Sequence, residues 1–103
     1  MKGKYSPGPV SELLESRLVI SLIMFVGDRG HCRKLDLFEE LSSDPVVADR
    51  IVMLEERGLL ETYEVPRSRS LEIALTSEGR AVYRELLEID DILRNLRTVL
   101  RLG

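Results

Sequence analysis

The sequence predicts a single, mainly α-helical domain with a small β-hairpin and a long last helix. The chain has 103 residues, a length that suits one domain. Hydrophobic residues make up 44% and charged residues 32%, so a packed interior is expected rather than disorder. The hydrophobic period is helical before Gly58, close to two between Leu60 and Leu75, and helical again after Thr76.

The first third of the chain predicts a flexible arm, a helix and a short extended piece. Residues 1–10 are interrupted by Gly and Pro and are expected to form the arm. Ser11 is the expected N-cap of a helix whose wide apolar stripe continues to Val26. Gly27 should end that helix, and residues 31–34 should be extended.

Two short helices should follow. Asp36 with Glu39 resembles a capping box at the start of the second helix, in which Leu37 and Leu41 point inward. Residues 42–45, Ser-Ser-Asp-Pro, then combine N-cap residues with a proline that is favoured in the first turn of a helix. A third helix over residues 45–57 is therefore expected, with its inward side chains at i, i+4 and i+7: Val47, Ile51 and Leu54.

After Gly58, alternating side chains predict a two-stranded hairpin. The alternating sets are Leu60 to Val65 and Leu71 to Leu75. The turn between them, residues 66–70, carries Arg67 and Arg69. Gly58 is expected to adopt the left-handed conformation that ends the third helix.

A last helix of about 25 residues should begin after Thr76 or Ser77 caps it. Its apolar residues follow a heptad pattern over nearly three repeats, and charged residues flank them. We expect this seam to pack against a second copy of the chain; the alternative is that it folds back onto the first helix. The seam consists of Val82, Leu86, Ile89, Leu93, Leu96 and Leu100.

Two motifs at this spacing resemble those of a known fold. LEERGLLE covers residues 54–61 and LTSEGR covers residues 75–80. Together with the order helix, strand, helix, helix, strand, strand, helix, the chain resembles small prokaryotic and archaeal winged helix-turn-helix regulators of the MarR and PadR groups over residues 11–90. The resemblance implies an arm over residues 1–10, a winged-helix core over 11–76 and a dimerisation helix over 77–103.

The resemblance also implies a function, that of a homodimeric, cytoplasmic transcriptional regulator that binds double-stranded DNA. The third helix would enter the major groove, and the hairpin would lie along the DNA backbone or minor groove. The residues of this sequence that would meet DNA are Arg67, Arg69, Arg50, Val46, Asp49, Met53 and Lys34.

The charge of the chain argues for a second hypothesis. Lys and Arg number 15 against 18 Asp and Glu, and the net charge is −3, whereas nucleic-acid binders usually carry a basic excess. The outward arc of the third helix is apolar and acidic rather than basic: Pro45, Val46, Asp49, Val52, Met53 and Glu56. This helix could instead dock a protein through Val46, Val52 and Met53.

Other classes of function have little support in the sequence. The single cysteine, Cys32, excludes an intramolecular disulfide, and His31 with Cys32 provides too few ligands for a closed zinc site. No phosphate-binding loop or catalytic triad pattern is present, so we expect neither an enzyme nor a cofactor. No apolar run is long enough to span a bilayer. Redox sensing through Cys32 and an unidentified small-molecule effector are left open.

Overall fold

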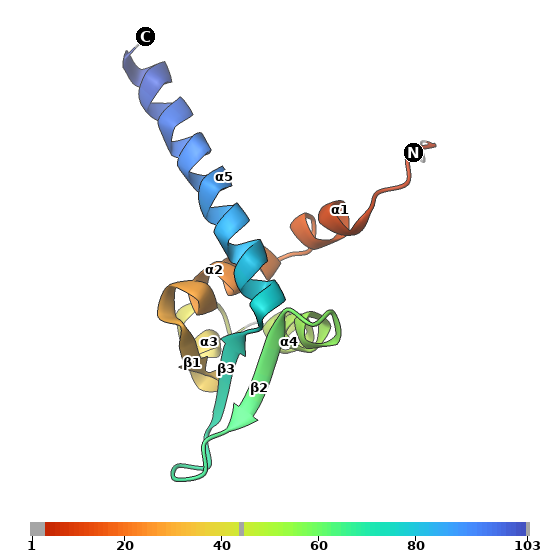
Figure 1. Cartoon of the computed structure of the whole chain (residues 1–103), viewed down its shortest axis with the longest axis vertical. Helices are drawn as coiled ribbons and strands as arrows, with labels where there is room; N and C mark the ends of the chain where they lie inside the picture. Colours follow the sequence, from red (N-terminus) through yellow and green to blue (C-terminus); the bar gives the residue numbers. More distant parts are fainter. Residues whose placement is uncertain (1–3, 44, 103) are drawn as a thin grey trace.

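The computed structural model describes residues 4–43 and 45–102, with side chains described up to Leu96. The described residues form five helices and three strands, and the last helix projects away from the sheet (Figure 1). In chain order the elements are α1 (Pro9–Leu14), α2 (Val19–Arg29), β1 (His31–Arg33), α3 (Lys34–Glu40), α4 (Val46–Glu56), β2 (Leu60–Glu64), β3 (Leu71–Leu75) and α5 (Ser77–Leu102).

The strands form a three-stranded antiparallel sheet in the order β1-β3-β2. The hairpin of β2 and β3 lies where the sequence predicts it, with Leu60 opposite Leu75. The extended piece expected at residues 31–34 is β1, which pairs with the far side of β3 and makes the sheet three-stranded. In this register both Cys32 and Thr62 lie opposite Ile73, so one face of the sheet is buried on the helices.

The core lies between that face of the sheet and the helices. The expected inward residues of α4, Val47, Ile51 and Leu54, are all buried, which confirms the helical spacing. The buried hydrophobic side chains are Val19, Leu22, Ile23, Val26, Cys32, Leu37, Val47, Ile51, Leu54, Leu60, Ile73, Leu75 and Leu86. The core is built almost entirely from Leu, Ile and Val, as the shortage of aromatic residues requires.

The predicted first helix is two helices joined by a corner. Leu18 adopts φ 68°, a left-handed conformation that breaks the helical path between α1 and α2. Ser11 is not the N-cap: α1 begins at Pro9 after Gly8, so two residues assigned to the arm are helical. The Ser16 hydroxyl donates to the Glu12 carbonyl at 2.7 Å and satisfies a backbone acceptor near the end of α1.

Gly27 does not end a helix, contrary to the prediction. Helix α2 continues through it to Arg29 and ends at Gly30, whose φ is 83°. Gly27 faces the ring of Tyr83 on α5, which lies where a larger side chain would be. The Tyr83 hydroxyl donates to Asp28 Oδ1 at 2.5 Å, so this corner fixes α5 against α2.

The start of α3 also differs in detail from the prediction. The capping box is formed by Arg33 and Asp36, not by Asp36 and Glu39. Asp36 accepts the Arg33 backbone N–H at 3.0 Å and pairs with its guanidinium at 2.8 Å. Because Arg33 stabilises the carboxylate, the pKa of Asp36 is lowered. Leu37 is buried as expected, and Leu41 is half-buried.

The end of α4 and the start of α5 are joined through Thr76. Gly58 has φ 77°, the left-handed conformation expected after α4. The Thr76 hydroxyl donates to the Gly58 carbonyl at 2.6 Å and accepts the Gly79 N–H at 3.0 Å. From this anchor α5 leaves the body, and its far end lies opposite the hairpin turn (Figure 1). In the described part of the chain, no helix is long and apolar enough to cross a membrane.

Candidate nucleic-acid interface

The hairpin turn, residues 66–70, is called the hairpin tip below. The Val65 N–H donates to the Ser70 carbonyl at 3.0 Å, and the Arg69 N–H donates to the Val65 carbonyl at 2.7 Å. Arg69 has φ 55°, and the hydroxyls of Ser68 and Ser70 lie 2.8 Å apart. These contacts give the hairpin tip a closed turn from which side chains point into solvent.

Arg67 and Arg69 are both exposed on the hairpin tip. Within the described residues, neither guanidinium group has an ion-pair or hydrogen-bond partner. Two unpaired guanidinium groups separated by one residue raise the local positive potential of a chain whose net charge is −3. Their planar donors suit phosphate oxygens or a narrow minor groove.

Helix α4 presents a surface of a different kind. Val52 is 50% exposed, and the carboxylates of Asp49 and Glu56 also reach solvent. Val46 and Met53 are half-buried, and Met53 packs against the core. The structure therefore places an apolar and acidic face on α4, as the spacing of its buried residues implies.

The remaining cationic candidates are less available than the arginines of the hairpin tip. Arg50 Nε donates to the Arg17 carbonyl at 3.0 Å, at the corner between α1 and α2. Lys34 is half-buried at the first position of α3. The predicted contact residues thus lie in separate places, the hairpin tip and the region of α3 and α4, and contact of any of them with DNA stays a prediction.

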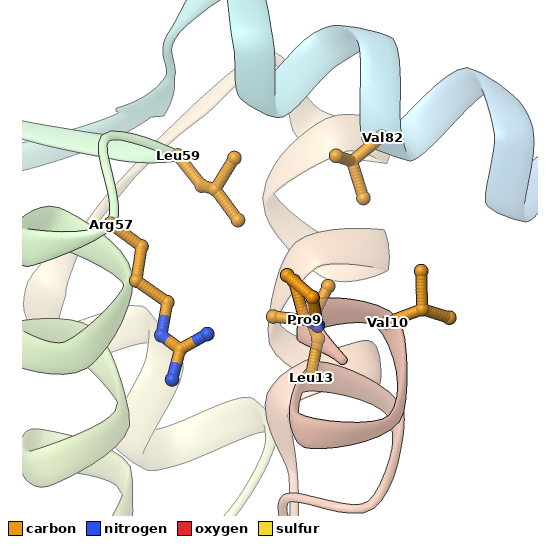
Figure 2. Close-up of a pocket in the computed structure, with 6 residues that line it drawn as sticks. All are labelled: Pro9, Val10, Leu13, Arg57, Leu59 and Val82. Carbon is orange, nitrogen blue, oxygen red and sulfur yellow. The ribbon is translucent and has the colours of Figure 1, made fainter. Parts of the chain in front are cut away.

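A hollow of about 420 Å³ lies between α1, α5 and the end of α4 (Figure 2). Its walls are almost wholly apolar, with Leu13 on α1, Leu59 before β2 and Val82 on α5 among them. Figure 2 shows Arg57 on the side opposite α1. Arg57 Nη2 lies 3.1 Å from Glu12 Oε2 on α1, so the cation of this lining is already paired within the chain.

The predicted seam on α5 divides at Leu86. Val82 and Leu86 pack on the core. Farther along, Ile89 is 47% exposed, Leu93 56% and Leu96 53%. The side chain of Leu100, the last predicted seam residue, lies outside the described residues. If the whole seam folded back onto the chain's own first helix, these three side chains would be buried. The structure leaves about half of each exposed.

Cys32 and His31 do not form a reactive pair. Cys32 is buried. Burial is the main cause that raises the pKa of its thiol, and the negative charge of nearby Asp36 is the second. His31 Nδ1 lies on the opposite face of the sheet, 3.1 Å from Glu72 Oε1. A buried thiol with a raised pKa is the opposite of the activated thiolate that redox sensing would need. No group of three or more His, Cys, Asp or Glu that could hold a metal occurs in the described part.

Comparison with known proteins supports the fold through structure alone. No family model matches the chain, and no curated protein matches it in sequence. A proposed MarR-family transcriptional regulator from Enterococcus faecalis V583 matches with a TM-score of 0.73 and 18% identity, covering 95% of this chain and 96% of that one. The proposed transcriptional regulator ytfH from Salmonella typhimurium matches with a TM-score of 0.68 and 27% identity, covering 88% and 84%.

A third solved structure contains nucleic acid. FabT from Streptococcus pneumoniae in complex with DNA matches with a TM-score of 0.72 and 19% identity, covering 85% of this chain and 67% of that one. This chain has the winged helix-turn-helix fold of MarR-family regulators. In that fold, the hairpin of β2 and β3 corresponds to the wing, and α4 corresponds to the second helix of the helix-turn-helix motif.

The chain is shorter than some winged-helix proteins that it matches. It covers 63% and 56% of the two structures of ZitR from Lactococcus lactis. The Enterococcus and Salmonella proteins are named as transcriptional regulators, not as enzymes.

The internal contacts of Arg50 and Arg57 were missed by sequence reasoning. Their partners lie 33 and 45 positions away in the chain, and no local pattern identifies them. Arg50 was expected among the residues that meet DNA. The structure instead brings it to the backbone of the corner between α1 and α2.

Proposed function

We propose that this protein is a DNA-binding transcriptional regulator that acts as a homodimer and contacts DNA mainly through its wing. The observation that carries the proposal is the pair of exposed guanidinium groups, Arg67 and Arg69, on the hairpin tip of a winged-helix fold. In this arrangement α4 enters the major groove, while the arginines hold phosphates or the minor groove. The complex of FabT with DNA supports the assignment by similarity of fold.

The acidic net charge is compatible with this proposal because the charges are unevenly placed. Of the arginines considered as DNA contacts, Arg50 is engaged within the chain, whereas those of the hairpin tip point into solvent. Asp49 and Glu56 on α4 would repel phosphates. The wing should therefore provide most of the electrostatic attraction and α4 little.

The proposal is tested by binding to a labelled random-sequence duplex at two salt concentrations. Each phosphate contact contributes about −0.9 to the slope of log affinity against log salt, so Arg67→Ala/Arg69→Ala should reduce the magnitude of the slope by about 1.8. Affinity at low salt should also fall. Fluorescence anisotropy measures both quantities on the same samples.

A matched control separates position from total charge. Arg84→Ala/Arg94→Ala removes the same number of charges from α5, away from the hairpin tip. We expect this variant to keep the wild-type slope. If wild-type protein binds no duplex at low salt, or if the two double variants weaken binding equally, the proposed role of the wing is wrong.

Dimerisation through α5 is the second part of the proposal. A stripe of leucine and isoleucine side chains about half exposed on a projecting helix is costly in water, and its heptad spacing suits a second copy of the same helix. The groove between α1 and α5 continues this apolar surface through Val10 and Leu14. A two-fold pair would direct two hairpin tips toward one duplex.

Substitution on the seam tests the dimer directly. Leu93→Glu should produce a monomer in sedimentation equilibrium, because it places a charge in the apolar seam. Leu87→Glu is the control, since Leu87 is 39% exposed and lies about 120° around the helix from Leu93. A Leu93→Glu protein that remains dimeric would contradict the assigned seam.

Docking of a protein by α4 is a second candidate function. The observation that favours it is the exposed Val52 flanked by Asp49 and Glu56, a face better suited to an apolar and basic protein surface than to phosphates. An apolar contact of this kind would respond little to salt. A DNA affinity that is absent, together with a partner whose binding is lost in Val52→Lys, would favour docking over DNA binding.

A further inference from the structure

Two arginine side chains, one from α4 and one from its C-cap, contact α1 and the corner that follows it. Arg57, at the C-terminal end of α4, pairs with Glu12 of α1 at 3.1 Å. About two turns earlier on the same side of the helix, Arg50 Nε donates to the Arg17 carbonyl at 3.0 Å. Both donors come from α4 or its C-cap, and both acceptors come from the segment that precedes α2.

This segment is a weakly anchored part of the body. None of the six residues of α1 is buried, although Leu13 packs against the core from one side. The corner behind α1 contains Leu18 at φ 68°, an unfavourable conformation for a leucine that surrounding contacts must hold. A short helix with no buried residue and a strained connection can shift with little loss of packing.

We propose that Arg50 and Arg57 are positioning residues, through which α1 sets the placement of α4. The inference rests on the proposed function, because it takes α4 as the helix presented to DNA. In this arrangement, the guanidinium groups do not contact phosphates. They hold α4 in a fixed position relative to α1 and the corner after it. Arg57 also lines the hollow beside α1, so the ion pair lies at the edge of that hollow.

The Glu12→Gln variant gives opposite expectations for positioning and for plain electrostatics. Removing one negative charge from an acidic protein should tighten binding to DNA if charge alone matters. If Glu12 holds Arg57, and through it α4, the same change should weaken duplex affinity by about two- to fivefold, the range of an exposed ion pair. Anisotropy titration with a labelled random-sequence duplex at low salt measures the sign.

Charge reversal and a neighbouring carboxylate provide the controls. Glu12→Arg/Arg57→Glu keeps the net charge and can rebuild the pair in the opposite sense, so it should restore affinity to within about twofold of wild type. Glu15→Gln makes the same charge change at an exposed carboxylate one turn away and should not weaken binding. Circular dichroism verifies that each variant is folded.

Amide hydrogen exchange tests the coupling without DNA. Glu12→Gln should speed exchange of the α4 amides by about two- to fivefold, and the reversed pair should slow it again. If no variant binds duplex but α4 exchange responds in this way, the proposed function fails while the positioning inference stands. If Glu12→Gln leaves α4 exchange unchanged, or tightens duplex binding as Glu15→Gln does, the positioning inference is overturned.

Discussion

The two ends of one leucine pattern behave differently in this molecule. Near the body, Leu86 is buried against α2 and the start of α5 is held by Thr76, Tyr83 and Gly79. Farther along the same helix, Ile89, Leu93 and Leu96 keep the heptad spacing, yet about half of each side chain is exposed. The pattern therefore continues past the point where the chain's own core ends.

This difference separates two reasons for an apolar residue on a helix. Leu86 is explained by the fold of a single chain, because it fills the space between α5 and the core. Leu93 is 56% exposed and contributes little to the packing of a single copy; the proposed dimer would give it a partner surface. A hydrophobic period thus identifies the face that is covered but not the molecule that covers it.

The largest expected effect contrasts one residue from each end. Leu22→Ala, at a fully buried position of α2, should lower the free energy of unfolding by about 2–5 kcal/mol. Leu93→Ala should cost less than about 0.5 kcal/mol in dilute protein, where the chain is monomeric. Urea unfolding followed by circular dichroism measures both.

Protein concentration then sharpens the contrast. The cost of Leu93→Ala should grow as concentration rises, because association stabilises the folded state by mass action, whereas the cost of Leu22→Ala should grow little. If Leu93→Ala destabilises the protein as much as Leu22→Ala even in dilute solution, the proposed difference between the two ends is wrong. Folding of a single copy would then require the far part of α5.

A smaller effect is expected at the joint between the two ends. A Cβ at position 79 would collide with the backbone carbonyl oxygen of Leu59, so Gly79→Ala should destabilise the protein by about 1–3 kcal/mol. Gly8→Ala is the control, since nothing lies within 4 Å of its added carbon. Thermal unfolding of the two variants measures the difference, and equal melting temperatures would show that the joint can relax.

The smallest effect concerns pH and belongs to the body alone. Arg33 lowers the pKa of Asp36 below its ordinary value of 3.8, so the pair stabilises the folded state above that pH and the contribution is lost as pH falls through the lowered pKa. Asp36→Asn should therefore be less stable than wild type at neutral pH, and the two should converge in acid. Melting temperatures recorded from pH 7 to pH 2 measure this. A constant difference over the whole range would exclude the ionised pair as its cause.

Periodicity within single elements allowed much of the fold to be predicted. The spacing of Val47, Ile51 and Leu54 identified the buried face of α4, and Gly58 and Thr76 were correctly assigned to the ends of helices. The wing was predicted from alternation, and the exposure of Arg67 and Arg69 followed from their place in its turn. These features depend on residues close together in the chain.

Features that depend on distant residues were missed. A glycine after an apolar stripe usually ends a helix, but Gly27 lies inside α2 because the ring of Tyr83, far along the chain, needs the space. A leucine gives no local sign of a left-handed conformation, so the corner at Leu18 could not be predicted. In the candidate site, Arg50 looked available for DNA because its partner, the Arg17 carbonyl, is brought to it only by folding.

The anchor at Thr76 makes α5 a lever. The helix has 26 residues and is about 39 Å long, and the hydroxyl at its base is bonded both to its own first turn and to the residue that ends α4. A tilt of about 5° at this pivot displaces the opposite end by roughly 3 Å over that length. In the proposed dimer, paired along α5, small rotations at the two Thr76 anchors would change the distance between the two hairpin tips. That distance has to match the pitch of the double helix if both tips are to contact one duplex.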